Sequence, residues 1–248
     1  MARMKGSWRR LTRRAGVSFG VLVAAYALLL VYPQPLFAYQ LAQGGIVVHA
    51  RRPIPEAMRD TLTKVRVRLD RSPLYDSSQT SHVFICEPRW VFALFARTNY
   101  RVGGIAHGLI GRHVFLRESD MDHDRLIGPS GQPVAADRPL SYFMAHELTH
   151  IIQARHLGLL AYARLPKWVD DGYADYVARD IDLGAALQGL KNDGRELDPA
   201  RSGLYLRYQL MIAFLLDVRQ TPLTSVLRRL DDGREVEREL RSLNAYPQ

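Results

Sequence analysis

A short segment in the second half of the chain holds the residue types that metal-dependent hydrolysis requires. His146, Glu147 and His150 form the pattern H-E-x-x-H in a segment with helical character. Residues four apart lie on one face of a helix, so the two imidazoles can bind one metal ion. The Glu147 carboxylate can then activate a metal-bound water without being a ligand itself. This pattern predicts one bound Zn²⁺ ion and zinc-dependent hydrolysis of peptide bonds.

The residues around the motif favour a buried helix over a solvated one. A surface helix with two histidines and a glutamate would show the same letters, but the neighbours here are apolar: Leu140, Phe143, Met144, Ala145, Leu148, Ile151 and Ile152. Unpaired polar groups are costly away from water. A buried set of two histidines and a glutamate therefore needs a polar or charged partner, and a bound metal ion can serve as that partner.

A catalytic zinc ion usually has three protein ligands and one open position. Cys86 is the only cysteine and lies in an apolar strand-like run, where a buried thiol is expected, so the third ligand is a histidine or a carboxylate. His156 has the spacing of a metzincin ligand. In that pattern a glycine stands where this chain has Gln153, a good helix former that would continue the helix and carry His156 off the ligand face.

The segment 165–176 supplies the other candidate. Together with the motif it resembles the gluzincin metallopeptidases, the group of thermolysin and the zinc aminopeptidases, whose second helix carries Trp-x-x-Glu-Gly-x-Ala. Trp168, Gly172 and Ala174 match, and Asp171 stands where the family has its glutamate ligand. The resemblance spans about residues 143–230 and implies that Asp171 is the third ligand, in preference to Asp170. An aspartate is one methylene shorter than the family's ligand.

The same resemblance implies further roles. Asp175, four residues after Asp171, matches an aspartate that hydrogen-bonds a zinc-bound histidine. Tyr205, or else Tyr208, matches a tyrosine that stabilises the oxyanion of the transition state. Residues 103–106 would be an edge strand that pairs with an extended peptide.

These residues predict a catalytic mechanism, and two alternative functions remain beside it. Zinc held by His146, His150 and Asp171 lowers the pKa of its water, and Glu147 accepts the proton and returns it to the leaving amine. A catalytically silent protein of the same fold, which binds a partner or a metal, is the first alternative. A metzincin-like peptidase with His156 as third ligand is the second.

The start of the chain is strongly basic and then apolar. The net charge of +9 comes largely from six residues: Arg3, Lys5, Arg9, Arg10, Arg13 and Arg14. Without them, 28 basic and 25 acidic residues remain, so no nucleic-acid partner is expected. Residues 15–32 are uncharged, which predicts a transmembrane anchor rather than a signal peptide cleaved near Ala38. A single-pass protein with a cytoplasmic N-terminus would have its catalytic domain outside the cytoplasm, in the periplasm of a Gram-negative cell.

Strand-like segments precede helical ones, which predicts an α+β fold. Strands are expected at 46–50, 83–86 and 113–116, and helices at 55–69, 137–158, 167–181 and 202–219. We therefore expect a basic cytoplasmic tail (1–14), the anchor (15–32), a linker (33–45) and a zincin-like metallopeptidase domain (46–248). Within that domain a small mixed sheet would be followed by a helical lobe, with a peptide or protein as substrate.

Overall fold

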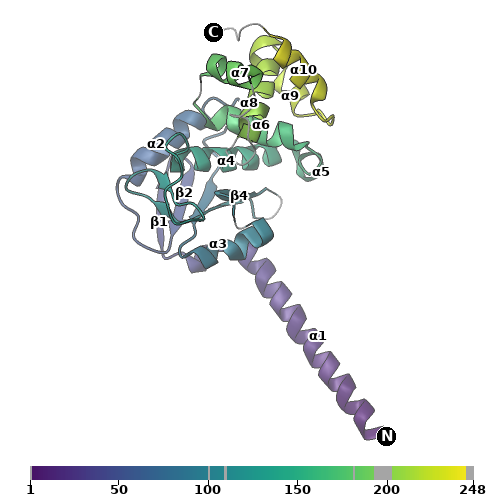
Figure 1. The fold of residues 1–248 in the computed structure, drawn as a ribbon. Coiled ribbons are helices and arrows are strands. Elements are labelled where there is room, and N and C mark those ends of the chain that lie inside the picture. The colour runs from purple at the N-terminus through teal and green to yellow at the C-terminus, as the bar shows by residue number, and fades with distance from the viewer. Residues whose placement is uncertain (1, 100, 109–110, 181, 193–202, 244–248) are drawn as a thin grey trace.

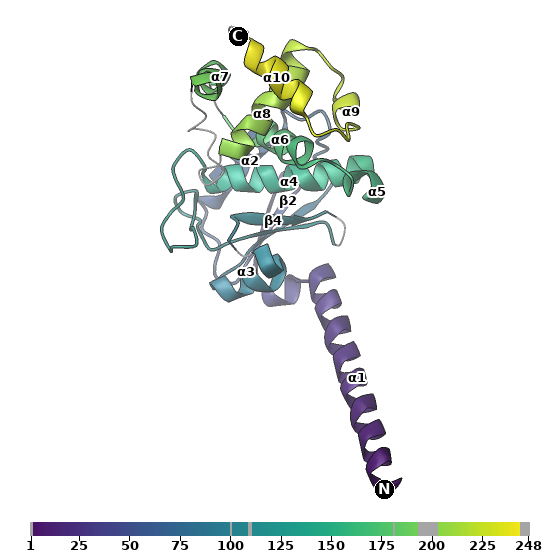
Figure 2. The ribbon, with the colours of Figure 1, turned by 45° about the vertical axis from the view of Figure 1, so that its right-hand side comes forward.

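The computed structural model describes residues 2–99, 101–108, 111–180, 182–192 and 203–243, with side chains for all of these except 2–15, 98, 191–192 and 203–205. A five-stranded mixed sheet is followed by a group of helices, so the predicted α+β class and mixed sheet are confirmed (Figure 1). A long helix, α1 (Ala2–Val31), projects away from this body in both views (Figure 2).

The sheet has the strand order β1-β2-β3-β5-β4, which leaves β1 and β4 at its edges. The two outer pairs are antiparallel and the two inner pairs are parallel. Its strands are β1 (Tyr39–Gln43), β2 (Ile46–Ala50), β3 (Ser81–Ile85), β4 (Gly104–His107) and β5 (His113–Leu116). The sheet begins at Tyr39, inside the segment 33–45 that the sequence predicts as a linker. Two short strands, β6 (Ser119–Asp120) and β7 (Arg125–Leu126), form a separate hairpin.

Alternation along the strands gives the sheet two buried faces. One face packs against α2 (Met58–Leu69) and α4 (Leu140–Leu157), with Val48, Val83 and Leu116 in the main core. The other face packs against α3 (Arg89–Ala96) in a smaller core that contains Phe84, Phe115 and the buried Cys86. The sheet therefore supports α4 from below while α3 covers its far side (Figure 1).

The helical half packs on the opposite side of α4. It consists of α5 (Leu159–Tyr162), α6 (Lys167–Ala178), α7 (Leu183–Asn192), α8 (Gly203–Ala213), α9 (Leu223–Val226) and α10 (Arg234–Ser242), with a π-helical segment at Phe214–Val218. Two 3-10 turns, Gln34–Leu36 and Arg97–Asn99, complete the described elements. Helix α4 is thus enclosed between the sheet and α6, which fixes the position of the H-E-x-x-H residues.

The structure contradicts the predicted anchor at 15–32. In the part of the chain that the structure describes, none of the helices combines the length and the apolar character that a membrane span requires, so the prediction of a single-pass anchor is wrong and the extracytoplasmic placement, which followed from that anchor, loses its basis. The end of the apolar run packs on the folded body instead. Leu30 is 3% exposed, the Tyr26 hydroxyl donates to the Leu94 carbonyl at 2.7 Å, and His113 hydrogen-bonds the Val31 carbonyl at 3.0 Å.

Candidate metal centre

Helix α4 presents both motif histidines to α6. The helix is apolar around most of its circumference, which explains why it lies buried, and His146, Glu147 and His150 are each less than 9% exposed. Its N-terminus is held by Asp124, whose carboxylate accepts the Ser141 backbone N–H at 2.7 Å and the Ser141 hydroxyl at 2.9 Å. It ends at Gly158, which has a positive φ of 75°, as the sequence predicts for this glycine.

Helix α6 carries Asp171 and is positioned by close packing on α8. A Cβ at Gly172 would lie 2.8 Å from the Tyr208 carbonyl oxygen, so only glycine allows this approach. The indole N–H of Trp168 donates to the Asp231 carbonyl at 2.8 Å and ties the start of α6 to the loop before α10. Trp168 and Gly172, two residues that carry the family resemblance, therefore fix the helix on which Asp171 lies.

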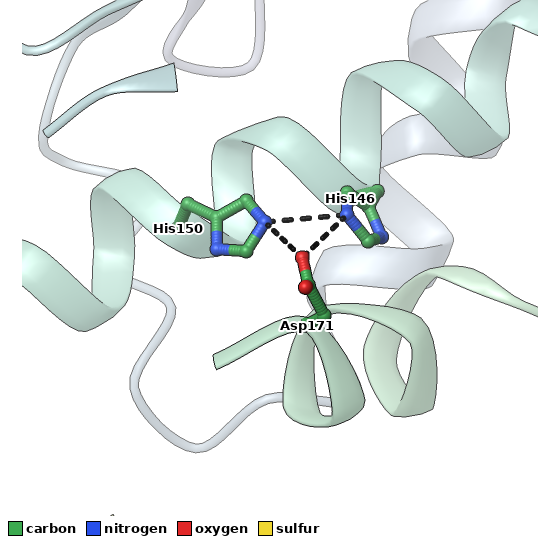
Figure 3. Close-up of side chains that lie close together, drawn as sticks. All are labelled: His146, His150 and Asp171. Carbon is green, nitrogen blue, oxygen red and sulfur yellow. Dashed lines mark hydrogen bonds and ion pairs between the residues drawn. The ribbon is translucent and has the colours of Figure 1, made fainter. Parts of the chain in front are cut away.

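His146, His150 and Asp171 converge on one point between α4 and α6 (Figure 3). The two Nε2 atoms are 3.2 Å apart, and Asp171 Oδ1 lies 3.6 Å from Nε2 of His150 and 3.9 Å from Nε2 of His146. In a tetrahedral zinc site with bonds of about 2.0–2.1 Å, neighbouring ligand atoms are roughly 3.3 Å apart. Two imidazoles and one carboxylate in this arrangement fit a zinc ion and leave a fourth position open.

A separate carboxylate orients each imidazole. Asp175 accepts a hydrogen bond from Nδ1 of His146 at 2.8 Å, and Asp170 accepts one from Nδ1 of His150 at 2.7 Å. Asp175 is fully buried and also accepts the Tyr142 hydroxyl at 2.7 Å. Such carboxylates fix the tautomer in which Nε2 is free to bind a metal. The contact of Asp175 with His146 matches the sequence expectation, whereas the contact of Asp170 with His150 was not anticipated.

The two carboxylates also control the charge of the histidines. Burial lowers the pKa of His146, but the hydrogen bond and charge of Asp175 outweigh burial and raise it. Burial likewise lowers the pKa of His150, and the charge and hydrogen bond of Asp170 raise it to about 10. The pKa of Glu147 is raised, mainly by burial. The negative charges that favour an imidazolium here equally favour a bound cation.

Glu147 lies between the ligands and the edge strand β4. The first strand residue is Gly104, where a Cβ would lie 2.8 Å from Cγ and 2.9 Å from Oε1 of Glu147. At Gly103, a Cβ would lie 2.5 Å from Cε1 of Phe143. The resemblance implies that a peptide pairs with this edge, which the structure does not test; it shows that both glycines also accommodate side chains of α4.

A cleft of about 700 Å³ opens over the three ligands and Glu147. One wall is the strand edge from Val102 to Ala106, and another is α4. Tyr162 at the end of α5 also lines it, and burial together with the charges of Asp170 and Glu147 raises the pKa of its phenol. The sequence carries no motif that points to Tyr162; only the turn of the chain after Gly158 brings it there.

The remaining candidates lie elsewhere. Tyr208 packs against the main core, with the Arg207 guanidinium 5.1 Å from its ring centroid, and it is not among the described residues that line the cleft. The side chain of Tyr205 lies outside the described part of the structure. His156 is exposed in the last turn of α4 and lines a separate hollow near Arg155, so it does not join His146 and His150.

Comparisons with known proteins add no relative. No protein-family model matches the sequence, and a search of curated proteins found no similar one. Functional interpretation of the site therefore depends on its geometry and on the resemblance of its motifs.

Proposed function

We propose that this protein is a zinc-dependent peptidase whose ligands are His146, His150 and Asp171. The observation that carries the proposal is the convergence of two Nε2 atoms and one carboxylate oxygen within 4.8 Å of one another, with Glu147 beside them in an open cleft. Both histidines are oriented from behind by carboxylates, as in catalytic zinc sites. The resemblance to gluzincin metallopeptidases supports the same assignment.

When bound, zinc would supply Lewis acidity, which lowers the pKa of a coordinated water and polarises the substrate carbonyl. The protein residues perform the other steps. Glu147 accepts the proton of the attacking water at its carboxylate and passes it to the leaving nitrogen. Asp170 and Asp175 keep the two imidazoles oriented through the cycle.

The edge strand β4 offers a means to hold an extended substrate. It pairs only with β5 in the sheet, and the strand edge from Val102 to Ala106 lines the cleft above Glu147. An extended peptide that added to this edge would form main-chain hydrogen bonds largely independent of its sequence. The peptide bond to be cleaved would then pass beside Glu147.

Two measurements on the purified full-length chain test this function. Metal analysis should find about one zinc per chain in the wild type and in Glu147→Gln, and a loss of zinc in Asp171→Ala. His156→Ala, an exposed histidine on the same helix, is the matched control and should keep its zinc. If His156→Ala lost its zinc and Asp171→Ala kept it, the result would favour a metzincin-like site.

Cleavage of an unstructured protein such as casein tests the role of Glu147. Loss of a general base lowers the rate by about 10²- to 10⁴-fold. We expect Glu147→Gln to bind zinc and to lose cleavage by at least the lower of these factors. Equal cleavage by the variant and the wild type contradicts the mechanism, and zinc binding without cleavage by either protein identifies a catalytically silent metal-binding protein.

A further inference from the structure

Three arginines line the part of the cleft that lies toward the N-terminal end of α4: Arg101, Arg117 and Arg138. Arg138 stands two residues before the first residue of α4, whereas the two histidine ligands, His146 and His150, lie about two and three turns into that helix. Arg117 follows β5, and its backbone N–H donates to the Gly103 carbonyl at 3.1 Å, which places it beside the chain that leads into β4. Arg101 precedes that same chain segment.

Two of these three arginines, Arg101 and Arg138, differ from many others in the described structure. Many other arginines form ion pairs, among them Arg52 with Glu87 and Arg66 with Asp70. For Arg101 and Arg138, no side-chain hydrogen bond or ion pair with a described residue is found, and Nε of Arg138 is buried without a hydrogen-bond partner there.

Arg117 is held more rigidly than the other two. It is 6% exposed, its Nε donates to the Ile127 carbonyl at 3.2 Å, and its guanidinium carbon lies 5.7 Å from the ring centroid of Phe92. These contacts fix a positive charge at the wall of the cleft without the mobility of a surface arginine. The positive end of the α4 dipole adds to the field in the same region.

The acids of the cleft gather around the candidate metal position. Asp170 accepts the hydrogen bond from His150, Asp171 points at the ligand position, and Glu147 lies beside them. Lys167 approaches Asp171 at 3.8 Å. Asp124, which caps α4, forms its ion pair with Lys64 at 3.1 Å. The cleft therefore combines a group of acids that suits a cation with a group of arginines that suits an anion.

We propose that this group of arginines, Arg101, Arg117 and Arg138, binds a carboxylate of the peptide substrate. This inference rests on the proposed peptidase function, because it takes the cleft to be the peptide-binding site. Guanidinium groups bind carboxylates through paired, charge-assisted hydrogen bonds. The carboxylate belongs either to an aspartate or glutamate side chain near the cleaved bond or to the C-terminus of a short peptide, and one set of substrates separates these sources.

The test uses quenched fluorescent peptides of one sequence, with glutamate, glutamine or lysine substituted at successive positions, each as free acid and as C-terminal amide. With the zinc-loaded wild type, kcat/KM should be about 10- to 100-fold higher for the carboxylate-bearing peptide, the range expected for charge-assisted hydrogen bonds. A preference that follows glutamate identifies a side-chain carboxylate, and one that follows the free acid identifies the C-terminus.

Arg138→Ala and Arg101→Ala should each reduce that preference, while kcat/KM for the neutral peptide and the zinc content stay close to wild type. Arg138→Lys should restore part of the preference, because it keeps the charge and loses the paired geometry. The matched control is Arg164→Ala, which removes the same charge from an exposed position outside the cleft lining and should leave the preference unchanged.

Binding to the zinc-loaded Glu147→Gln variant, measured by fluorescence anisotropy with the same peptides, separates the two hypotheses. If the wild type cleaves no peptide, the peptidase function fails, and the binding comparison still decides whether the arginines recognise a carboxylate. Equal binding and equal kcat/KM for the glutamate, glutamine, acid and amide peptides overturn the inference while peptidase activity stands. Equal loss of preference in Arg164→Ala and Arg138→Ala also overturns it.

Discussion

A methyl group at Gly104 tests whether the position of Glu147 determines turnover. The Cβ of an alanine there would lie 2.8 Å from Cγ and 2.9 Å from Oε1 of Glu147, and 2.6 Å from Cδ2 of Leu116. The backbone of Gly104 is paired with β5 at Leu116 and cannot retreat easily. Since carbon atoms in contact are about 3.5–4.0 Å apart, the Glu147 side chain must move by roughly 0.7–1.2 Å.

The expected cost follows from that displacement. Inserting one methyl group into a packed site destabilises a fold by about 1–3 kcal/mol, so Gly104→Ala should still fold. A misplacement of about 1 Å at a reacting group lowers the rate roughly 100-fold, which corresponds to about 2.7 kcal/mol of transition-state stabilisation. His146, His150 and Asp171 are not among the nearest atoms to the new methyl group, so zinc binding should persist.

Gly103→Ala is the matched control. Its Cβ would lie 2.5 Å from Cε1 of Phe143 and 2.9 Å from Cδ2 of Leu126, which is equally crowded, and none of its three nearest atoms belongs to Glu147. Neither glycine has a positive φ, so backbone strain does not separate the two variants. The assay is peptide cleavage by zinc-loaded protein, with kcat/KM corrected for the folded fraction. Equal losses in the two variants, or full activity of Gly104→Ala, would refute the argument that Glu147 must stay where the glycine allows it.

Two further predictions concern groups behind the site and in the sheet. Asp175→Asn should lower zinc affinity about 10- to 100-fold, measured by competition with a chromogenic chelator, because it weakens the group that orients His146; unchanged affinity would contradict that role. His49 is 4% exposed, and burial, followed by the charges of His82 and His113, lowers its pKa from 6.5 to about 4. The unfolded chain therefore binds more protons between about pH 4 and 6.5, so the free energy of unfolding should fall by up to about 3 kcal/mol as the pH drops through that window. Urea unfolding should show a smaller fall in His49→Gln, and an identical pH dependence of the two proteins would contradict the assignment.

The sequence was sufficient for the elements that follow from periodicity and from the metal motif. The four-residue spacing of His146 and His150 determines a shared helix face whatever the rest of the fold does. The alternation of strand residues, and the glycine at 158 where the predicted helix 137–158 ends, likewise predict local structure that the protein contains. These features depend on neighbours within one or two turns of the chain, which explains why the sequence is sufficient to predict them.

Other features depend on contacts between distant segments and were out of reach. Asp170 and Asp171 are adjacent in the sequence and chemically equivalent, so only the register of the family resemblance selects Asp171 for the metal position, and nothing in the sequence indicates that Asp170 reaches Nδ1 of His150. The packing of α6 against α4 determines which of these two carboxylates faces the metal position and which one reaches His150. The anchor prediction failed for the same reason: an apolar run does not reveal that Tyr26, Leu30 and Val31 contact the folded body.

The aspartate at the ligand position shows how the fold adapts to a short side chain. Asp171 Oδ1 lies 3.6 and 3.9 Å from the two Nε2 atoms, only a few tenths of an ångström beyond the roughly 3.3 Å of a tetrahedral zinc site. A carboxylate one methylene shorter than glutamate reaches this far only if α6 lies close to α4. The glycine at 172 does not face α4; it allows α6 to pack tightly on α8 and so helps to hold the helix in place. The neighbouring Asp170 also binds α4 through His150, so the same pair of residues both approaches the metal position and fastens the two helices that form it.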